Sequence, residues 1–416
     1  MGLSEWLLAR AADSPRPMVV SVPHGTRVRL LAEAAILERG WRGAQSPVHA
    51  GMLVVCGTPD HSLTEAVDRV WGQVPGPRVR VDLPHDASEE RVAEALDRGI
   101  AHLADGRAQR AEASERTEAR GPAQEHHDHG DGHHGDGGQD DGGHEHHMGA
   151  PGGLAMAERG PDRDGLTLDR LHVPLGPVLP YWPAGLVVDT VTQGDVIQEA
   201  SVRFLGGAGW ERFWDEPWLA ALDGRRVTRG EAARRRAASH LDGLGRLLAV
   251  AGWEWAAVEA TRLRDRALRG EPGGTLAPAY ARFARRVEGS RVLRWMLRGV
   301  GPVDIPDLPW AAGDVWARLR RRLGETRAAL GEMDDDRALI GDGGPCGPAD
   351  GELDDDRALG GDEGPRGPVA GRRSRALIEV LPALLTGCEL AAARLVVASL
   401  DPDTDQLRSA GEVVHA

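Results

Sequence analysis

The first hundred residues alternate between short apolar runs and amphipathic stretches. Apolar runs at residues 18–22, 52–56 and 79–83 predict strands, because they are brief, rich in Val and bounded by turn residues. Stretches at 27–39, 62–73 and 88–104 predict helices; in the middle one, Leu63, Val67, Val70 and Val74 fall on one helical face. Strands and helices alternating at these lengths predict an α/β domain over residues 1–107, with a parallel sheet and flanking helices.

The pattern differs from residue 166 to residue 416. Residues 186–191 and 196–202 predict a β-hairpin across a turn at 192–195. Helices are expected at 229–269, 277–297, 314–330 and 374–390, and the run RLVVASL at 394–400 predicts a closing strand. The prediction is a mainly helical α+β domain with an N-terminal β-hairpin.

Two segments lack apolar periodicity. Residues 108–165 are rich in Gly, Asp and His; this composition buries too little surface to offset chain entropy and predicts a disordered linker. Residues 331–370 hold a tandem repeat, GEMDDDRALIGDGGPCGPAD followed by GELDDDRALGGDEGPRGPVA. Two copies rich in Gly and Pro predict a solvated acidic loop rather than a solenoid.

The net charge of −14 is concentrated in these two segments. Residues 121–150 and 331–370 carry −7 and −9, so the two predicted domains are together close to neutral. This argues against a nucleic-acid partner. No run of about 18 apolar residues predicts a membrane span, and no secretory leader is recognised. The expected location is the cytoplasm, with attachment to a membrane through a partner left open.

Residues 46–81, SPVHAGMLVVCGTPDHSLTEAVDRVWGQVPGPRVRV, carry a first resemblance. An apolar strand ends in Gly-Thr, a helix follows, and Pro-Gly-Pro precedes the next strand. This order resembles the small iron–sulfur subunit of respiratory complex I and of its [NiFe]-hydrogenase relatives. In that family the last strand leads to a cluster-binding cysteine, whereas residues 78–87 here, RVRVDLPHDA, contain none. The resemblance implies the scaffold without its cluster.

Residues 171–202, LHVPLGPVLPYWPAGLVVDTVTQGDVIQEASV, resemble the start of the large quinone-site subunit of complex I. The matching positions are Gly176, Pro177, Pro180, Gly185, Gly194 and Asp195. Two histidines of that family help to line the quinone pocket; here Leu179 stands at the first position and Pro183 near the second. The Cys-x-x-Cys pairs that hold nickel and iron in hydrogenases are absent too. The chain therefore resembles a fusion of the two subunits, degenerate in both active sites.

A histidine-rich tract at residues 125–147 is the candidate metal site. Imidazole nitrogens suit Ni²⁺ and Zn²⁺, and a Gly-rich chain can wrap around an ion, although drift in a linker gives the same composition. The candidate ligands are His126, His127, His129, His133, His134, His144, His146 and His147.

Other candidates have simpler structural explanations. The three cysteines, Cys56, Cys346 and Cys388, show no cluster, zinc or disulfide spacing. Asp60, after the Gly-Thr-Pro turn, is expected to cap the following helix. His240 is expected to be a packed side chain rather than a proton carrier. The tryptophans at 210, 214 and 218 predict core or interface.

These observations favour a non-catalytic accessory, assembly or structural protein related to NADH-quinone oxidoreductase subunits. Its expected partners are subunits of a membrane-associated respiratory or hydrogenase-like complex, and no catalytic cofactor is expected. The alternative is a His-rich protein that stores or delivers nickel or zinc. An enzyme whose cofactor chemistry leaves no recognisable motif is a third hypothesis, since no phosphate-binding, zinc-protease or serine-hydrolase motif occurs.

Overall fold

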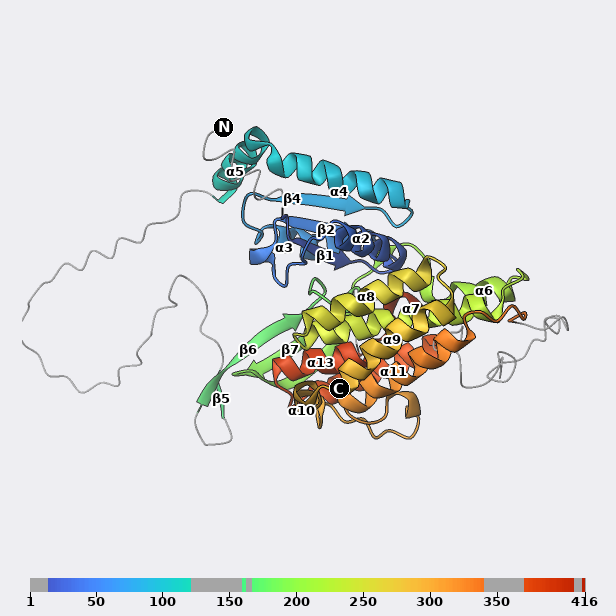
Figure 1. The fold of residues 1–416 in the computed structure, drawn as a ribbon. Helices are drawn as coiled ribbons and strands as arrows, with labels where there is room; N and C mark the ends of the chain where they lie inside the picture. Colours follow the sequence, from blue (N-terminus) through green and yellow to red (C-terminus); the bar gives the residue numbers. More distant parts are fainter. Residues whose placement is uncertain (1–13, 121–158, 162–166, 340–369, 408–413, 416) are drawn as a thin grey trace, which may run out of the picture.

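The three apolar runs near the N-terminus form one parallel sheet, as predicted. Its strands are β1 (Pro17–Ser21), β2 (Met52–Cys56) and β4 (Val79–Leu83), in the order β1-β2-β4. The structure, a computed structural model, describes residues 14–120, 159–161, 167–339, 370–407 and 414–415 (Figure 1). The central strand β2 is buried along its whole length, which explains its continuous apolar sequence.

Helices cover both faces of this sheet. Helices α2 (Thr26–Glu38) and α4 (Glu89–Ala104) pack on one face, and α3 (His61–Trp71) packs on the other. Alternate side chains of β2 serve the two faces: Met52, Val54 and Cys56 join the first core, and Leu53 and Val55 join the second. This confirms the predicted α/β class.

The first part of the predicted linker is a helix. Residues Gly106–Arg120 form α5, which is held beside the start of β4 rather than leaving the domain. The Gln109 side chain accepts from the Arg78 backbone N–H at 2.9 Å and donates to its carbonyl at 3.0 Å, and Glu112 pairs with the Arg78 guanidinium at 2.7 Å. Tertiary contacts with one arginine thus order a segment too polar to predict as a helix. Most of the remaining linker and the tandem repeat from residue 340 lie outside the described residues.

The described residues from 159 onward, which we call the second domain, begin with an antiparallel sheet in the order β10-β8-β7-β6-β5. The predicted hairpin is confirmed as β7 and β8. Leu186 pairs with Phe204 at its open end, and Gln193 pairs with Val196 next to the turn. The strands are β5 (Arg159–Pro161), β6 (Thr167–Leu175), β7 (Leu186–Gln193), β8 (Val196–Phe204) and β10 (Val414–His415).

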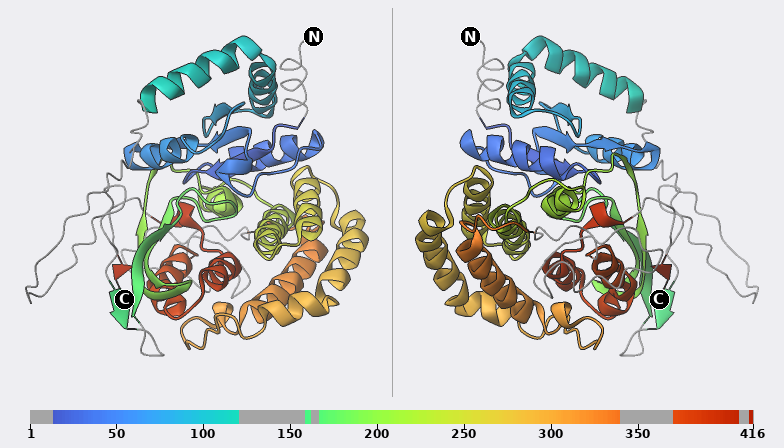
Figure 2. Two further views of the ribbon diagram at one scale, coloured as in Figure 1. Left: turned by 90° about the vertical axis from the view of Figure 1, so that its left-hand side faces the viewer. Right: turned by 90° about the vertical axis from the view of Figure 1, so that its right-hand side faces the viewer.

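A helical bundle packs against this sheet around the long helix α7 (Figure 2). Its α-helices are α6 (Glu216–Leu222), α7 (Arg229–Val250), α8 (Glu254–Leu268), α9 (Gly273–Glu288), α10 (Arg291–Leu297), α11 (Val315–Glu332), α12 (Ala370–Leu385) and α13 (Leu390–Leu400). Three short 3₁₀ turns accompany these helices: η3 (Phe213–Asp215) precedes α6, η4 (Pro309–Ala311) lies between α10 and α11, and η6 (Thr404–Gln406) follows α13. No helix in the described part of the chain is long and apolar enough to cross a membrane.

Two predicted helices and one predicted strand in this region require correction. The expected single helix at 229–269 is two helices, because Gly252 adopts a φ of +77° between α7 and α8. The expected helix at 277–297 divides into α9 and α10, where Ser290 caps the second through the Leu293 N–H at 3.2 Å. The expected strand at 394–400 is part of helix α13. This helix is largely buried in the bundle, so its sequence is apolar on nearly all sides. It therefore lacks the polar positions at helical spacing that distinguish a helix from a strand.

Candidate functional site

The second domain covers the edge of the parallel sheet where the strands end. After β1, the chain turns at His24 and Gly25 into α2; a Cβ at Gly25 would collide with the carbonyl of Cys56. The Asp405 carboxylate, from η6, accepts from the His24 N–H at 2.6 Å and from the Thr26 hydroxyl at 2.7 Å. The first strand end is thus tied to the C-terminal part of the chain.

The next strand end is closed in the same way. After β2, residues Thr58–Pro59 (β3) pair with Gly207–Ala208 (β9) of the second domain. Asp60 caps α3 through the Leu63 N–H at 2.8 Å, as predicted, and its other oxygen accepts from the Gly206 N–H at 2.9 Å. In open α/β sheets this carboxyl edge is the usual ligand-binding crevice. Here the ends of β1 and β2 are covered by contacts with other parts of the protein.

A network of buried charges joins α2 to the bundle. At its centre lies the Asp242 carboxylate of α7. Arg29 of α2 donates to both of its oxygens, at 2.8 and 3.1 Å. Arg264 of α8 donates to it at 2.8 Å, and Arg246 lies 3.1 Å away. Arg264 also donates to Glu33 of α2 at 2.6 Å, so two residues of α2 contribute to the cluster.

We call this cluster the interdomain ionic network. Its members are Arg29, Glu33, Asp242, Arg246, Arg264, Asp265, Arg322 and Asp401. Burial alone would raise the pKa of Asp242, but Arg29, Arg246 and Arg264 lower it well below its usual range. Four arginines and four carboxylates therefore balance one another. Such a balanced set adds little net stability but is costly to break.

The network ends at Asp401, the residue that follows α13. Its backbone adopts a left-handed φ of +51°, and its carboxylate lies 2.6 Å from Arg246 and 3.2 Å from Arg322. Gly243 of α7 faces this pair, and a Cβ there would collide with both the Arg322 guanidinium and the Asp401 carboxylate. A side chain at position 243 would therefore have to displace the ends of these two charged side chains.

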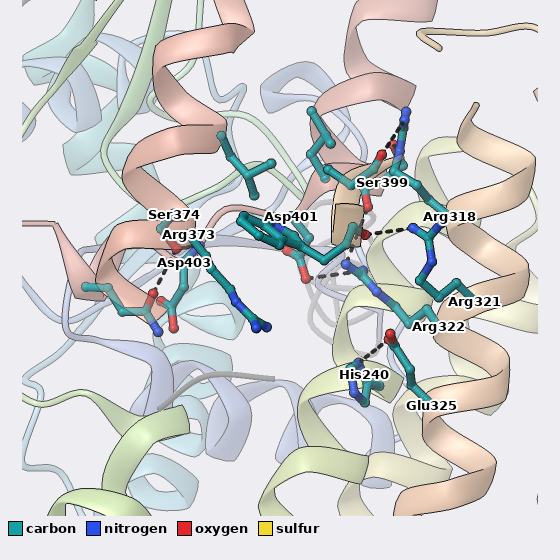
Figure 3. Close-up of a pocket in the computed structure, with 15 residues that line it drawn as sticks. His240, Arg318, Arg321, Arg322, Glu325, Arg373, Ser374, Ser399, Asp401 and Asp403 are labelled. Atoms are coloured by element: carbon teal, nitrogen blue, oxygen red, sulfur yellow. Dashed lines mark hydrogen bonds and ion pairs between the residues drawn. The ribbon is translucent and has the colours of Figure 1, made fainter. Parts of the chain in front are cut away.

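A cavity of about 120 Å³ lies beside Asp401. Helix α11 contributes Arg318, Arg321 and Arg322 to its wall, and α12 contributes Arg373 from the opposite side (Figure 3). The Arg373 guanidinium lies over the Trp310 ring of η4, 4.9 Å from the ring centre. We call this the arginine-lined cavity.

The carboxylates of this cavity have partners in the protein. Asp401 is held by Arg246 and Arg322, and Glu325 lies 3.8 Å from the His240 ring. Asp403 accepts from the Asp405 N–H at 3.2 Å. His240 is thus a packed residue, as the sequence predicted, with an acidic neighbour.

The residues that stand at the family's functional positions have packing roles in this structure. Leu179 packs against the core of the second domain, and Pro183 is buried in the loop between β6 and β7. Cys56 is fully buried, and burial raises the pKa of its thiol. The tryptophan stripe divides: Trp214 and Trp218 are buried, as predicted, while Trp210 is 88% exposed.

The candidate metal site is outside what the structure describes. His126, His127, His129, His133, His134, His144, His146 and His147 all lie between residues 121 and 158. Within the described ranges, no group of three or more His, Cys, Asp or Glu side chains is arranged to hold a metal ion. Metal binding by the tract stays a prediction.

Sequence reasoning missed both the ionic network and the cavity. A weak signal exists: Arg29 stands between Val28 and Leu30, and Asp242 between Leu241 and Gly243, where a buried helix face is expected to be apolar. A charge in such a position must find a buried partner. The sequence does not reveal which partner, because the pairs join residues up to 231 positions apart.

Comparisons with known proteins give structural similarity but no sequence match. No protein-family model matches the chain, and no curated protein sequence matches it significantly. Among solved structures, one chain of the membrane-bound sulfane sulfur reductase, an archaeal respiratory membrane complex, is similar with a TM-score of 0.37 and 15% identity. The similarity covers 57% of this chain and 98% of that chain. A similarity of this degree assigns the chain neither a family nor any residue roles.

Proposed function

We propose that this protein is a non-catalytic accessory, assembly or structural protein related to complex I subunits. One observation carries the proposal: the ends of β1 and β2, where such sheets bind ligands, are covered by the protein's own second domain. Hydrogen bonds from Asp60 and Asp405 close it, and the interdomain ionic network anchors α2 beside it. Such a junction holds two domains as one unit and leaves little room for a substrate between them.

The cysteines of this chain do not fit the iron–sulfur cluster that the family of the first resemblance binds. Such clusters are held by about four cysteine thiolates, or by two cysteines and two histidines at one type of centre. The whole sequence has three cysteines. Cys56 lies in the core beneath the strand ends with a raised pKa, and Cys388 lies in the other domain. We therefore derive no redox step for this chain.

The first test is chemical. The full chain is purified anaerobically and incubated with iron and sulfide, and its electron paramagnetic resonance spectrum is recorded after reduction. We expect no cluster signal and no quinone reductase activity. A stoichiometric 4Fe–4S signal would overturn the proposal.

The second test is cellular. In a strain lacking the gene, respiratory complexes are resolved on native gels, and we expect loss of one assembled membrane complex. The wild-type chain should restore it, whereas Asp242→Asn, which disrupts the junction, should restore it poorly. Asp97→Asn, on the surface of α4, is the matched control. Normal complexes in the deletion strain would contradict an assembly or structural role.

Metal storage or delivery by the histidine tract is the second candidate. It is favoured by eight histidines within 22 residues of a Gly- and Asp-rich segment. Removing residues 125–147 should abolish tight Ni²⁺ or Zn²⁺ binding in calorimetry and slow growth in metal-limited cells. Unchanged growth would exclude this role, even if the isolated tract binds metal.

A further inference from the structure

The arginine-lined cavity has properties that the accessory role does not explain. From its geometry we infer that it binds a small tetrahedral oxyanion, of the size and charge of phosphate or sulfate. The argument rests on the charge inventory of the wall, the donors it presents and its volume.

Two of its guanidinium groups are bound to neutral oxygens rather than to carboxylates. Arg318 donates to the carbonyls of Gly301 and Gly313, at 3.0 and 2.5 Å, and to the Ser399 hydroxyl at 2.9 Å. Arg321 donates to the carbonyls of Trp310 and Ala312, at 2.7 and 3.0 Å. Among the described residues, neither makes an ion pair with an acid. The protein fixes their positions without neutralising them.

Burial makes this arrangement costly. Arg318 is 5% exposed, and its pKa is lowered to about 10, chiefly by burial and also by Arg321 and Arg322, while the nearby Asp314 raises it. Three like charges on one helix repel one another where water screens them little. An anion in the cavity would offset this repulsion, and the carboxylates of the wall already have other partners.

The cavity also presents a donor without an acceptor. The indole N–H of Trp310 is buried, and no acceptor within the described ranges lies in hydrogen-bonding reach. Buried donors in native proteins are nearly always satisfied, so an unpaired one points to a missing acceptor. Arg373, over the same ring, adds a further positive charge to the wall.

The volume sets the size of the ligand. About 120 Å³ is somewhat below the ~150 Å³ of an engineered cavity that holds one benzene molecule. A tetrahedral oxyanion fits such a space, and the remainder of a larger phosphate ester would lie outside it. Guanidinium groups match its oxygens with strong charge-assisted hydrogen bonds.

The test uses the full chain in chloride buffer, with inorganic phosphate as the titrant in calorimetry. Tryptophan fluorescence gives a second readout, since Trp310 should report occupancy and Trp310→Phe should remove that change. Arg321→Gln and Arg373→Gln, on opposite walls, should each weaken binding by about tenfold or more. Their matched controls are Arg320→Gln and Arg375→Gln, on the same helices but outside the cavity wall, which should stay within about twofold of wild type.

Circular dichroism checks that each variant is folded; if Arg321→Gln is not, Arg373→Gln and Arg373→Lys provide the test from the other wall. Sulfate should compete with phosphate, and chloride at equal ionic strength should not. Glycerol phosphate distinguishes two sources of the ligand: equal binding indicates a phosphoester head group, and weaker binding a free anion. Absence of phosphate binding, or equal binding by wild type and both glutamine variants, would overturn the inference.

Discussion

At the scale of single residues, one buried carboxylate organises the contact between the two domains. Asp242 is 2% exposed and lies within 3.1 Å of the guanidinium groups of Arg29, Arg246 and Arg264. Its removal leaves three positive charges with one neutralising partner fewer, in a region that water screens poorly. Residues of this kind decide whether the domains stay together.

We expect Asp242→Asn to lower the free energy of unfolding by about 3–5 kcal/mol, because it breaks a buried ionic network from one side. Chemical denaturation measures this. The control Asp97→Asn removes an exposed partner of Arg39, 66% exposed, and should cost less than about 1 kcal/mol. Equal losses of unfolding free energy in the two variants would show that the buried network contributes no more to stability than an exposed ion pair.

Glycine gives a second prediction at this scale. Gly243→Ala places a methyl group against the Arg322–Asp401 ion pair, so we expect a loss of about 1–3 kcal/mol. Gly324→Ala, in α11, has nothing within 4 Å of the added Cβ and should stabilise the helix by about 0.5–1 kcal/mol. Thermal melts of both variants check the opposite signs. A stabilising Gly243→Ala would mean that the ion pair can move aside.

At the scale of elements, the local sequence defines several helix starts through capping side chains, but it does not define which elements the helices pack against. Ser88, Thr228 and Asp314 all accept hydrogen bonds from the first turns of α4, α7 and α11. Asp60 does the same for α3 and in addition holds the β9 segment through Gly206. One carboxylate thus joins a helix cap to an interdomain contact.

Asp60→Ala should therefore cost about 1–3 kcal/mol, a cap plus a second charge-assisted hydrogen bond. Ser88→Ala is the matched control, since Ser88 caps α4 through the Arg91 N–H within its own domain, and its loss should cost about 1 kcal/mol. Hydrogen exchange gives a sharper readout: only Asp60→Ala should increase exchange at Gly206. Equal exchange in both variants would contradict the interdomain role.

At the scale of the whole molecule, the pH dependence of stability should report the interdomain ionic network. Burial opposes ionisation of Asp242, but its three arginines lower the folded-state pKa below the unfolded value of about 3.9. This contribution is complete above that unfolded value and is lost as the pH falls. The pKa of Asp265 is raised by burial, so its contribution has the opposite sign and offsets part of the loss.

Wild type should keep its network-dependent stability from neutral pH down to about pH 4 and lose it progressively below. Asp242→Asn should be less stable at neutral pH and show a shallower acid dependence. Urea midpoints measured across this pH range check both. Parallel curves for the two proteins would mean that Asp242 does not carry the dependence.

The sequence by itself determined the α/β domain, the hairpin and most helix positions, because periodicity and capping are local properties of the chain. It did not show the breaks between α7 and α8 or between α9 and α10, and it failed at α5 and α13. Helix α5 is held by Gln109 and Glu112 against Arg78, and helix α13 is buried in the bundle. Both depend on contacts with residues outside the helix, which its own sequence does not reveal. Only the tertiary structure decided the site. Arg29 meets Asp242 across 213 positions, and four arginines line one cavity, because folding joins distant helices. Pairing of buried charges is a property of the assembled fold, and no local pattern encodes it.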